Sequence, residues 1–125
     1  MKEREITVRV GAISAKARLF DTPTADAVWQ ALPFESSYDV WGGEIYFTIP
    51  VSTGLEGTAQ EMVEKGDLGY WPSGRAFCIF FGPTPISGAH EIRAAGKVNV
   101  FGKVTDKPEA FTGASPDGRI RVERS

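Results

Sequence analysis

The side chains best suited to bind or transform a ligand are a set of aromatic rings and one carboxylate on neighbouring expected strands. The rings with this placement are Trp41, Tyr46, Tyr70, Trp71, Phe77 and Phe81. Aromatic rings can line an apolar pocket and bring polar groups to its edge. Glu44 is expected on the same strand face as Tyr46, where its carboxylate would fix a ligand or act as a base. The alternative is that each ring belongs to the core and that Glu44 is an exposed strand residue.

His90 and Cys78 are the other residues with catalytic chemistry. His90 is the only histidine; no nucleophile-elbow pattern accompanies it, and a single loop histidine is usually solvated. An enzyme that uses Glu44 together with His90 on one ligand remains a hypothesis. Cys78 is the only cysteine and lies between Phe77 and Ile79. This setting is typical of a small buried side chain and not of a reactive thiolate.

Neither a metal nor a cofactor is expected from the residue pattern. A single histidine and a single cysteine on different expected elements make no set of metal ligands. The acidic residues do not have the spacing of a calcium loop. Gly42-Gly43 and the segment 66–69 match no nucleotide-binding loop, so we interpret both as turns.

Charge and hydropathy narrow the classes of partner. The net charge is −2, with acidic and basic residues interspersed, which excludes the basic surface typical of nucleic-acid binding. No apolar run reaches the ~18 residues that span a bilayer. The charged residues 1–5 lead directly into a strand pattern and not into a signal peptide. We therefore expect a cytoplasmic protein whose partners include neither nucleic acid nor a membrane.

The pattern of apolar residues predicts one mostly β domain over residues 1–125. Fourteen glycines and eight prolines favour many short strands. The centre is Ala76–Phe81, an apolar run with no polar residue on either face, which indicates a strand covered on both sides. The other expected strands cover residues 5–10, 13–19, 34–41, 44–49, 68–71, 97–104 and 119–123. Closure of these roughly eight strands into a β-barrel would protect their edges.

Two connecting segments have different signals. Thr22-Pro23 opens a short helix that ends before Pro33, because threonine is a good N-cap and proline is tolerated at the first helical position. Segment 51–65 remains open between helix, strand and loop. Thr58 and Glu61 have the spacing of a capping box, so we favour a loop with a short helix.

Two segments in the second half of the chain carry the clearest motifs. Segment 66–85 contains Tyr70-Trp71-Pro72 and ends in Phe80-Phe81-Gly82-Pro83-Thr84-Pro85, and segment 99–104 reads Asn-Val-Phe-Gly-Lys-Val. Together they resemble the cyclophilin-like superfamily, and most closely its small uncharacterised bacterial and archaeal members. The resemblance implies a closed cyclophilin-like β-barrel with one or two short helices.

Catalytic cyclophilins, which the chain resembles in these segments, isomerise the peptide bond before proline. They use an arginine, from a strand with a Phe-His-Arg pattern, to hydrogen-bond the proline nitrogen. The matching strands here, 38–41 and 44–47, contain neither arginine nor histidine. Arg75 and Arg93 are the nearby candidates for a substitute.

The sequence therefore predicts a cyclophilin-like domain that binds a small molecule or short peptide. The expected ligand-binding residues are Trp41, Glu44, Tyr46, Tyr70, Trp71, Phe77, Phe81 and His90. The alternative is a diverged peptidyl-prolyl cis-trans isomerase, because a fold transfers between proteins more readily than an activity does. A surface with so many aromatic residues would also suit a homodimer interface.

Overall fold

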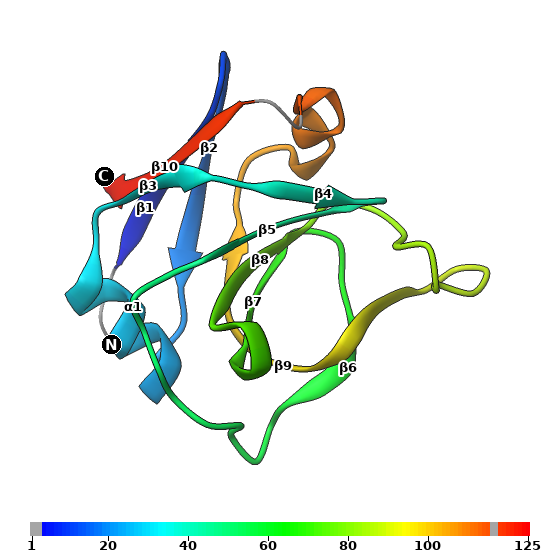
Figure 1. Cartoon of the computed structure of the whole chain (residues 1–125), viewed down its shortest axis with the longest axis horizontal. Helices are drawn as coiled ribbons and strands as arrows, with labels where there is room; N and C mark the ends of the chain where they lie inside the picture. Colours follow the sequence, from blue (N-terminus) through cyan, green and yellow to red (C-terminus); the bar gives the residue numbers. More distant parts are fainter. Residues whose placement is uncertain (1–3, 116–117) are drawn as a thin grey trace.

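Ten antiparallel strands are the main elements of the computed structural model, which describes residues 4–115 and 118–125 (Figure 1). They are β1 (Glu5–Val10), β2 (Ile13–Leu19), β3 (Phe34–Ser37), β4 (Asp39–Trp41), β5 (Glu44–Thr48), β6 (Gln60–Val63), β7 (Asp67–Trp71), β8 (Ala76–Phe80), β9 (Ile92–Val104) and β10 (Arg119–Arg124). One α-helix, α1 (Pro23–Ala31), and two 3-10 segments, η1 (Pro72–Gly74) and η2 (Pro108–Gly113), complete the described elements. No helix within the described ranges is long and apolar enough to cross a membrane.

The strands form an open sheet with the order β3-β10-β1-β2-β9-β7-β8-β5-β4. The prediction of a closed barrel is wrong, because β3 pairs only with β10 and β4 only with β5 at the two ends of this order. These end strands follow each other in the chain on either side of Tyr38, so they lie end to end and share no hydrogen-bonded ladder. The expected single strand over residues 34–41 is therefore two strands.

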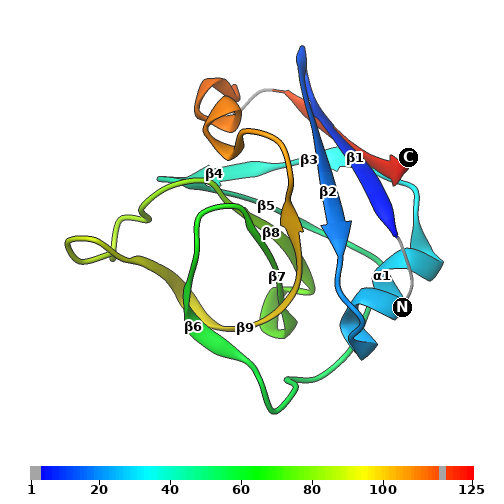
Figure 2. The same ribbon diagram turned by 180° about the vertical axis from the view of Figure 1, so that it is seen from behind.

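β9 is the longest strand and connects distant parts of the sheet. Its first half pairs with β6, its middle with β7 and its end with β2. Figure 2, seen from behind, shows β9 curving from β6 towards β2. This curve carries the first half of β9 away from the sheet, where it covers side chains that would otherwise be exposed.

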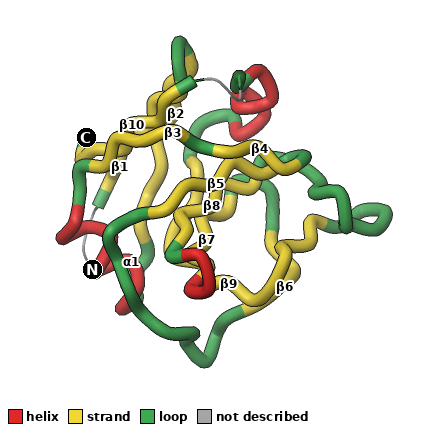
Figure 3. Tube along the Cα trace, viewed as in Figure 1, coloured by secondary structure: helices red, strands yellow, loops and turns green. Residues whose placement is uncertain are grey.

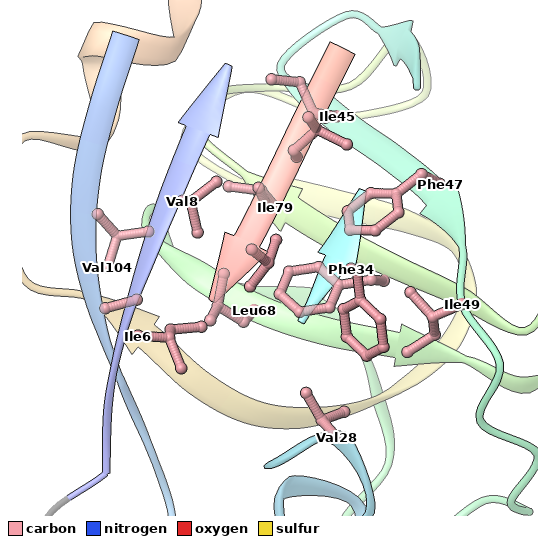
Figure 4. Close-up of a cluster of buried hydrophobic side chains, with 14 of the residues drawn as sticks. Ile6, Val8, Val28, Phe34, Ile45, Phe47, Ile49, Leu68, Ile79 and Val104 are labelled. Carbon is pink, nitrogen blue, oxygen red and sulfur yellow. The ribbon is translucent and has the colours of Figure 1, made fainter. Parts of the chain in front are cut away.

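β8 separates two clusters of buried side chains. Phe77 and Ile79 point into the main core, and Ala76, Cys78 and Phe80 belong to a second cluster with residues of β6 and β9. Every residue of β8 is buried, so the prediction of a strand covered on both faces is confirmed. The main core is aromatic: the rings of Phe47 and Phe77 stack with centroids 5.1 Å apart. Figure 4 shows Phe34 and Phe47 within this core beside Ile45 and Ile79.

The helix α1 begins as the sequence predicts. The hydroxyl of Thr22 accepts a hydrogen bond of 3.1 Å from the backbone N–H of Ala25, and Pro23 occupies the first turn. This cap satisfies one of the N–H groups that a helix leaves without an intrahelical partner.

Segment 51–65 is a loop followed by β6, and the expected short helix is wrong. The buried amide of Asn99 donates to the carbonyl of Gly54 (2.9 Å) and accepts from the backbone N–H of Glu56 (2.8 Å). Its amide group also donates to the hydroxyl of Thr24 (3.0 Å), so the loop is fixed against α1. Figure 3 shows this loop in green as it runs past α1 to β6. Glu61 pairs with Arg93 across β6 and β9 instead of capping a helix.

Gly43 is the point where the β4–β5 hairpin contacts the end of β8. Its carbonyl accepts from the backbone N–H groups of Phe81 (2.7 Å) and Gly82 (3.1 Å), and its own N–H donates to the carbonyl of Pro83 (2.8 Å). A Cβ atom at Gly43 would lie 2.2 Å from the carbonyl carbon of Gly82. No side chain fits at this position unless the two backbones separate.

We therefore expect Gly43→Ala to lower the free energy of unfolding by about 3 kcal/mol, because the added methyl group overpacks a contact between two backbones. Gly54→Ala is the matched control, since a Cβ atom at Gly54 meets no atom within 4 Å. Urea unfolding followed by tryptophan fluorescence measures both. Equal midpoints for the two variants would contradict the expectation.

Candidate ligand-binding site

A cavity of about 180 Å³ lies on the side of β5 and β8 that faces away from the main core. We call it the aromatic pocket. Its lining residues are Trp41, Glu44, Tyr46, Trp71, Cys78, Ala94, Ala95 and Val98. Four of the eight expected ligand-binding residues therefore meet here, namely Trp41, Glu44, Tyr46 and Trp71.

Strand alternation and register place the floor of the aromatic pocket. Glu44 and Tyr46 share one face of β5, while Ile45 and Phe47 on the other face belong to the main core. Tyr46 lies directly opposite Cys78 of β8 in the antiparallel register. Cysteine is a small side chain, and its position opposite a large ring leaves space above it.

Trp71 forms a wall whose position is fixed by two glycines. A Cβ atom at Gly74 would lie 3.0 Å from the Cε3 atom of the indole, and one at Gly96 would lie 3.1 Å from its Nε1 atom. The backbone thus approaches the ring from two segments, one in η1 and one in β9. This close packing gives the ring little room to move.

The remaining wall comes from small apolar residues of β9 that sequence reasoning did not assign to the site. Ala94, Ala95 and Val98 lie where the first half of β9 passes over the sheet. Their side chains carry no chemical group that would have singled them out. Only the path of β9 reveals that they face the rings.

Glu44 is the only acidic residue in the pocket lining, and its carboxyl group is buried. It is 6% exposed, so the interpretation as an exposed strand residue is wrong. Burial raises the pKa of the Glu44 carboxyl to about 7, although a hydrogen bond with the thiol of Cys78 acts in the opposite direction. Burial, and then the charge of Glu44, raise the pKa of the Cys78 thiol well above its usual value. At neutral pH the carboxyl group is therefore present in both protonation states.

The other four expected site residues lie elsewhere. Tyr70 and Phe77 are fully buried in the main core, and the hydroxyl of Tyr70 donates to the carbonyl of Val51. Phe81 and His90 line a wider surface hollow of about 880 Å³ that also includes Gly42 and Gly43. His90 is exposed there. Glu44 and His90 consequently line different cavities.

The two candidate substitutes for the cyclophilin arginine are also outside the aromatic pocket. Arg75 is exposed in the turn after η1. Arg93 lies on β9 and pairs with Glu61 (3.4 Å) and Glu91 (3.2 Å). Within residues 4–115 and 118–125, no group of three histidine, cysteine, aspartate or glutamate side chains is placed to hold a metal ion.

Comparisons with known proteins match this fold over its whole length. A family model described as Cyclophilin-like matches residues 4–123. The solution structure of a hypothetical protein from Archaeoglobus fulgidus is similar, with a TM-score of 0.82 and 38% sequence identity. The match covers 98% of this chain and 95% of that one. No curated protein matches the chain.

Burial of Glu44 predicts a specific pH dependence of stability. Because its pKa is raised from 4.5 to about 7 on folding, the native state binds more protons than the unfolded state between these values. Stability is therefore lost as the pH rises through this window. We expect the free energy of unfolding of Glu44→Gln relative to the natural protein to rise by about 3 kcal/mol from pH 4.5 to pH 7.5, measured by urea unfolding.

Glu91→Gln is the control for this titration. A hydrogen bond from the backbone N–H of Gly88 lowers the pKa of Glu91, so its ionised form favours the native state. The stability of this variant relative to the natural protein should fall as the pH rises, in the opposite direction to Glu44→Gln. If the difference in the free energy of unfolding between Glu44→Gln and the natural protein does not change with pH, the Glu44 carboxyl group is solvated.

Proposed function

The chain belongs to the cyclophilin-like family, and we propose that it binds a small molecule, or one side chain of a short peptide, in the aromatic pocket without isomerising it. The observation that supports this proposal is a cavity whose lining includes three aromatic rings and one buried carboxyl group, Glu44. Small-molecule sites typically combine such an apolar lining with a few polar groups.

The volume of the pocket limits what can enter it. An apolar cavity of roughly 150 Å³ in a protein accommodates a benzene molecule. The aromatic pocket, at about 180 Å³, therefore has room for one ring or one branched group of a ligand. The rest of the ligand would extend past Trp41, which is half-buried, and Ala95, which is exposed at the rim.

Binding without isomerisation is favoured by the side chains that line the pocket. The lining includes no arginine and no histidine, and its ionisable groups are Glu44, Tyr46 and Cys78. The ionised carboxylate of Glu44 has no proton to donate to a proline nitrogen, and its protonated form carries no positive charge, unlike a guanidinium group. An enzyme that joins Glu44 and His90 receives no support, because the two residues line different cavities.

The first test is a screen of single-ring fragments and short peptides by two-dimensional NMR. We expect hits to shift the amide signals of Tyr46, Trp71 and Val98. Trp41→Ala should weaken these hits at least about fivefold, because it removes one aromatic wall. The control is Trp29→Ala, since Trp29 packs against Arg4 and Arg124 outside the pocket. If Trp41→Ala leaves the affinity of the hits unchanged, or if no fragment or peptide binds, the proposal is contradicted.

The second test addresses the isomerase alternative. In a coupled proteolysis assay on a chromogenic X-Pro peptide, we expect the rate with the protein to equal the rate in buffer, because no guanidinium group lines the pocket. A rate above buffer that disappears in Arg93→Ala or Arg75→Ala would restore the isomerase alternative and identify the arginine responsible.

A further inference from the structure

We propose that the group which enters the aromatic pocket is a small organic cation, specifically a methylated ammonium group. This inference rests on the proposed function and names the chemical class of its ligand. The geometry that carries it is a small cavity in which Trp41, Tyr46 and Trp71 surround the same space as the buried carboxyl group of Glu44.

The charges around Glu44 leave a position for a cation. Cys78 on β8 shares a hydrogen bond with Glu44, and Tyr46 on β5 has Glu44, Asp39 on β4 and Cys78 as electrostatic neighbours; none of these groups is positively charged. The side chains that β7 and β9 contribute to the pocket are uncharged. Among the residues that the structure describes, neither Glu44 nor Asp39 has a lysine, arginine or histidine nitrogen within 4.0 Å.

A buried carboxylate without a counter-ion is unfavourable, and this cost disappears when a cation enters the same space. Several other carboxylates in the described part of the chain do have a basic partner: Glu35, for example, pairs with Arg121 at 2.9 Å on the surface. The complementary charge for Glu44 is therefore one that none of the described side chains supplies.

The aromatic rings favour a methylated cation over a strongly hydrated one. The faces of tryptophan and tyrosine rings attract cations, most strongly where water is excluded. Methyl groups on the nitrogen reduce the hydration that the cation must lose, and they contact the apolar side chains of Ala94 and Val98. The size of the pocket, about 180 Å³, suits a trimethylammonium group.

The protonation equilibrium of Glu44 predicts how the affinity for a cation should depend on pH. A cation binds the ionised carboxylate, so its affinity must increase as the pH rises through about 7, and its binding near that pH must release protons. A neutral ligand whose carbonyl accepts a hydrogen bond from the protonated carboxyl group has the opposite dependence. The sign of the pH dependence therefore distinguishes the two classes.

The experiment compares choline with 3,3-dimethylbutan-1-ol, in which carbon replaces the charged nitrogen, by NMR titration and calorimetry. At pH 8 we expect choline to bind at least tenfold more tightly than the alcohol. Choline should bind about tenfold more weakly at pH 6 than at pH 8, following the ionised fraction of a group with a pKa of about 7. Glu44→Gln should remove the pH dependence and reduce the preference for choline, because the aromatic rings remain, whereas Glu61→Gln, an exposed carboxylate on β6, should leave both unchanged.

A second arm identifies the source of the cation. A pentapeptide with a central trimethyllysine is compared with the same peptide containing unmodified lysine, and with free choline. Similar affinities for choline and the trimethyllysine peptide would show that the charged group alone is recognised. Tighter binding of the peptide would identify a modified protein tail as the ligand. Both results support the inference.

The remaining outcomes would contradict the inference that the ligand is a cation. If choline and the alcohol bind equally, or if affinity increases as the pH falls, the pocket binds a neutral group and only the assignment to cations is wrong. If single-ring fragments bind and choline does not, the proposed function stands and this inference fails. If neither the fragments nor choline bind, both fail.

Discussion

The burial of β8 on both faces is the constraint on which the rest of the structure depends. A strand with no polar side chain must be covered twice, once by the main core and once by a second layer. The main core covers Phe77 and Ile79, and the first half of β9, together with β6, covers Ala76, Cys78 and Phe80. The curve of β9, the position of β6 and the presence of a second cluster all follow from this requirement.

The aromatic pocket is the part of this second layer that is not filled. Cys78 and the alanines of β9 are small, and the indole of Trp71 is held by close backbone contacts at Gly74 and Gly96. The small side chains leave space at the floor of the cavity, and the close contacts restrict movement of the Trp71 ring into it. Folded proteins usually fill such spaces and pair such acids, and this cavity with a buried carboxyl group is the observation on which the proposed binding site rests.

Membership of the cyclophilin-like family describes the scaffold, and the aromatic pocket describes the chemical groups that this chain places on it. The family match extends over residues 4–123, which include nine of the ten strands in full and all but the last residue of β10. The polar group at the aromatic pocket is, however, an acid and not a guanidinium group. The family match therefore does not by itself assign a ligand, because function depends on the groups at the site and not on the fold alone.

The sequence by itself determined the local features of this protein: the alternating strands, the cap of α1 at Thr22 and the burial of Ala76–Phe81 on both faces. These follow from the order of neighbouring side chains, which the chain carries without reference to distant residues. Tertiary structure alone decided that the sheet stays open at Tyr38 and that the loop after β5 is held by Asn99, some forty residues away. It also separated Tyr70 and Phe77 from Trp41, Tyr46 and Trp71, and brought β9 over Glu44. Such outcomes depend on contacts between segments far apart in the chain, and the periodicity of a single strand does not specify which of its faces will be enclosed by another.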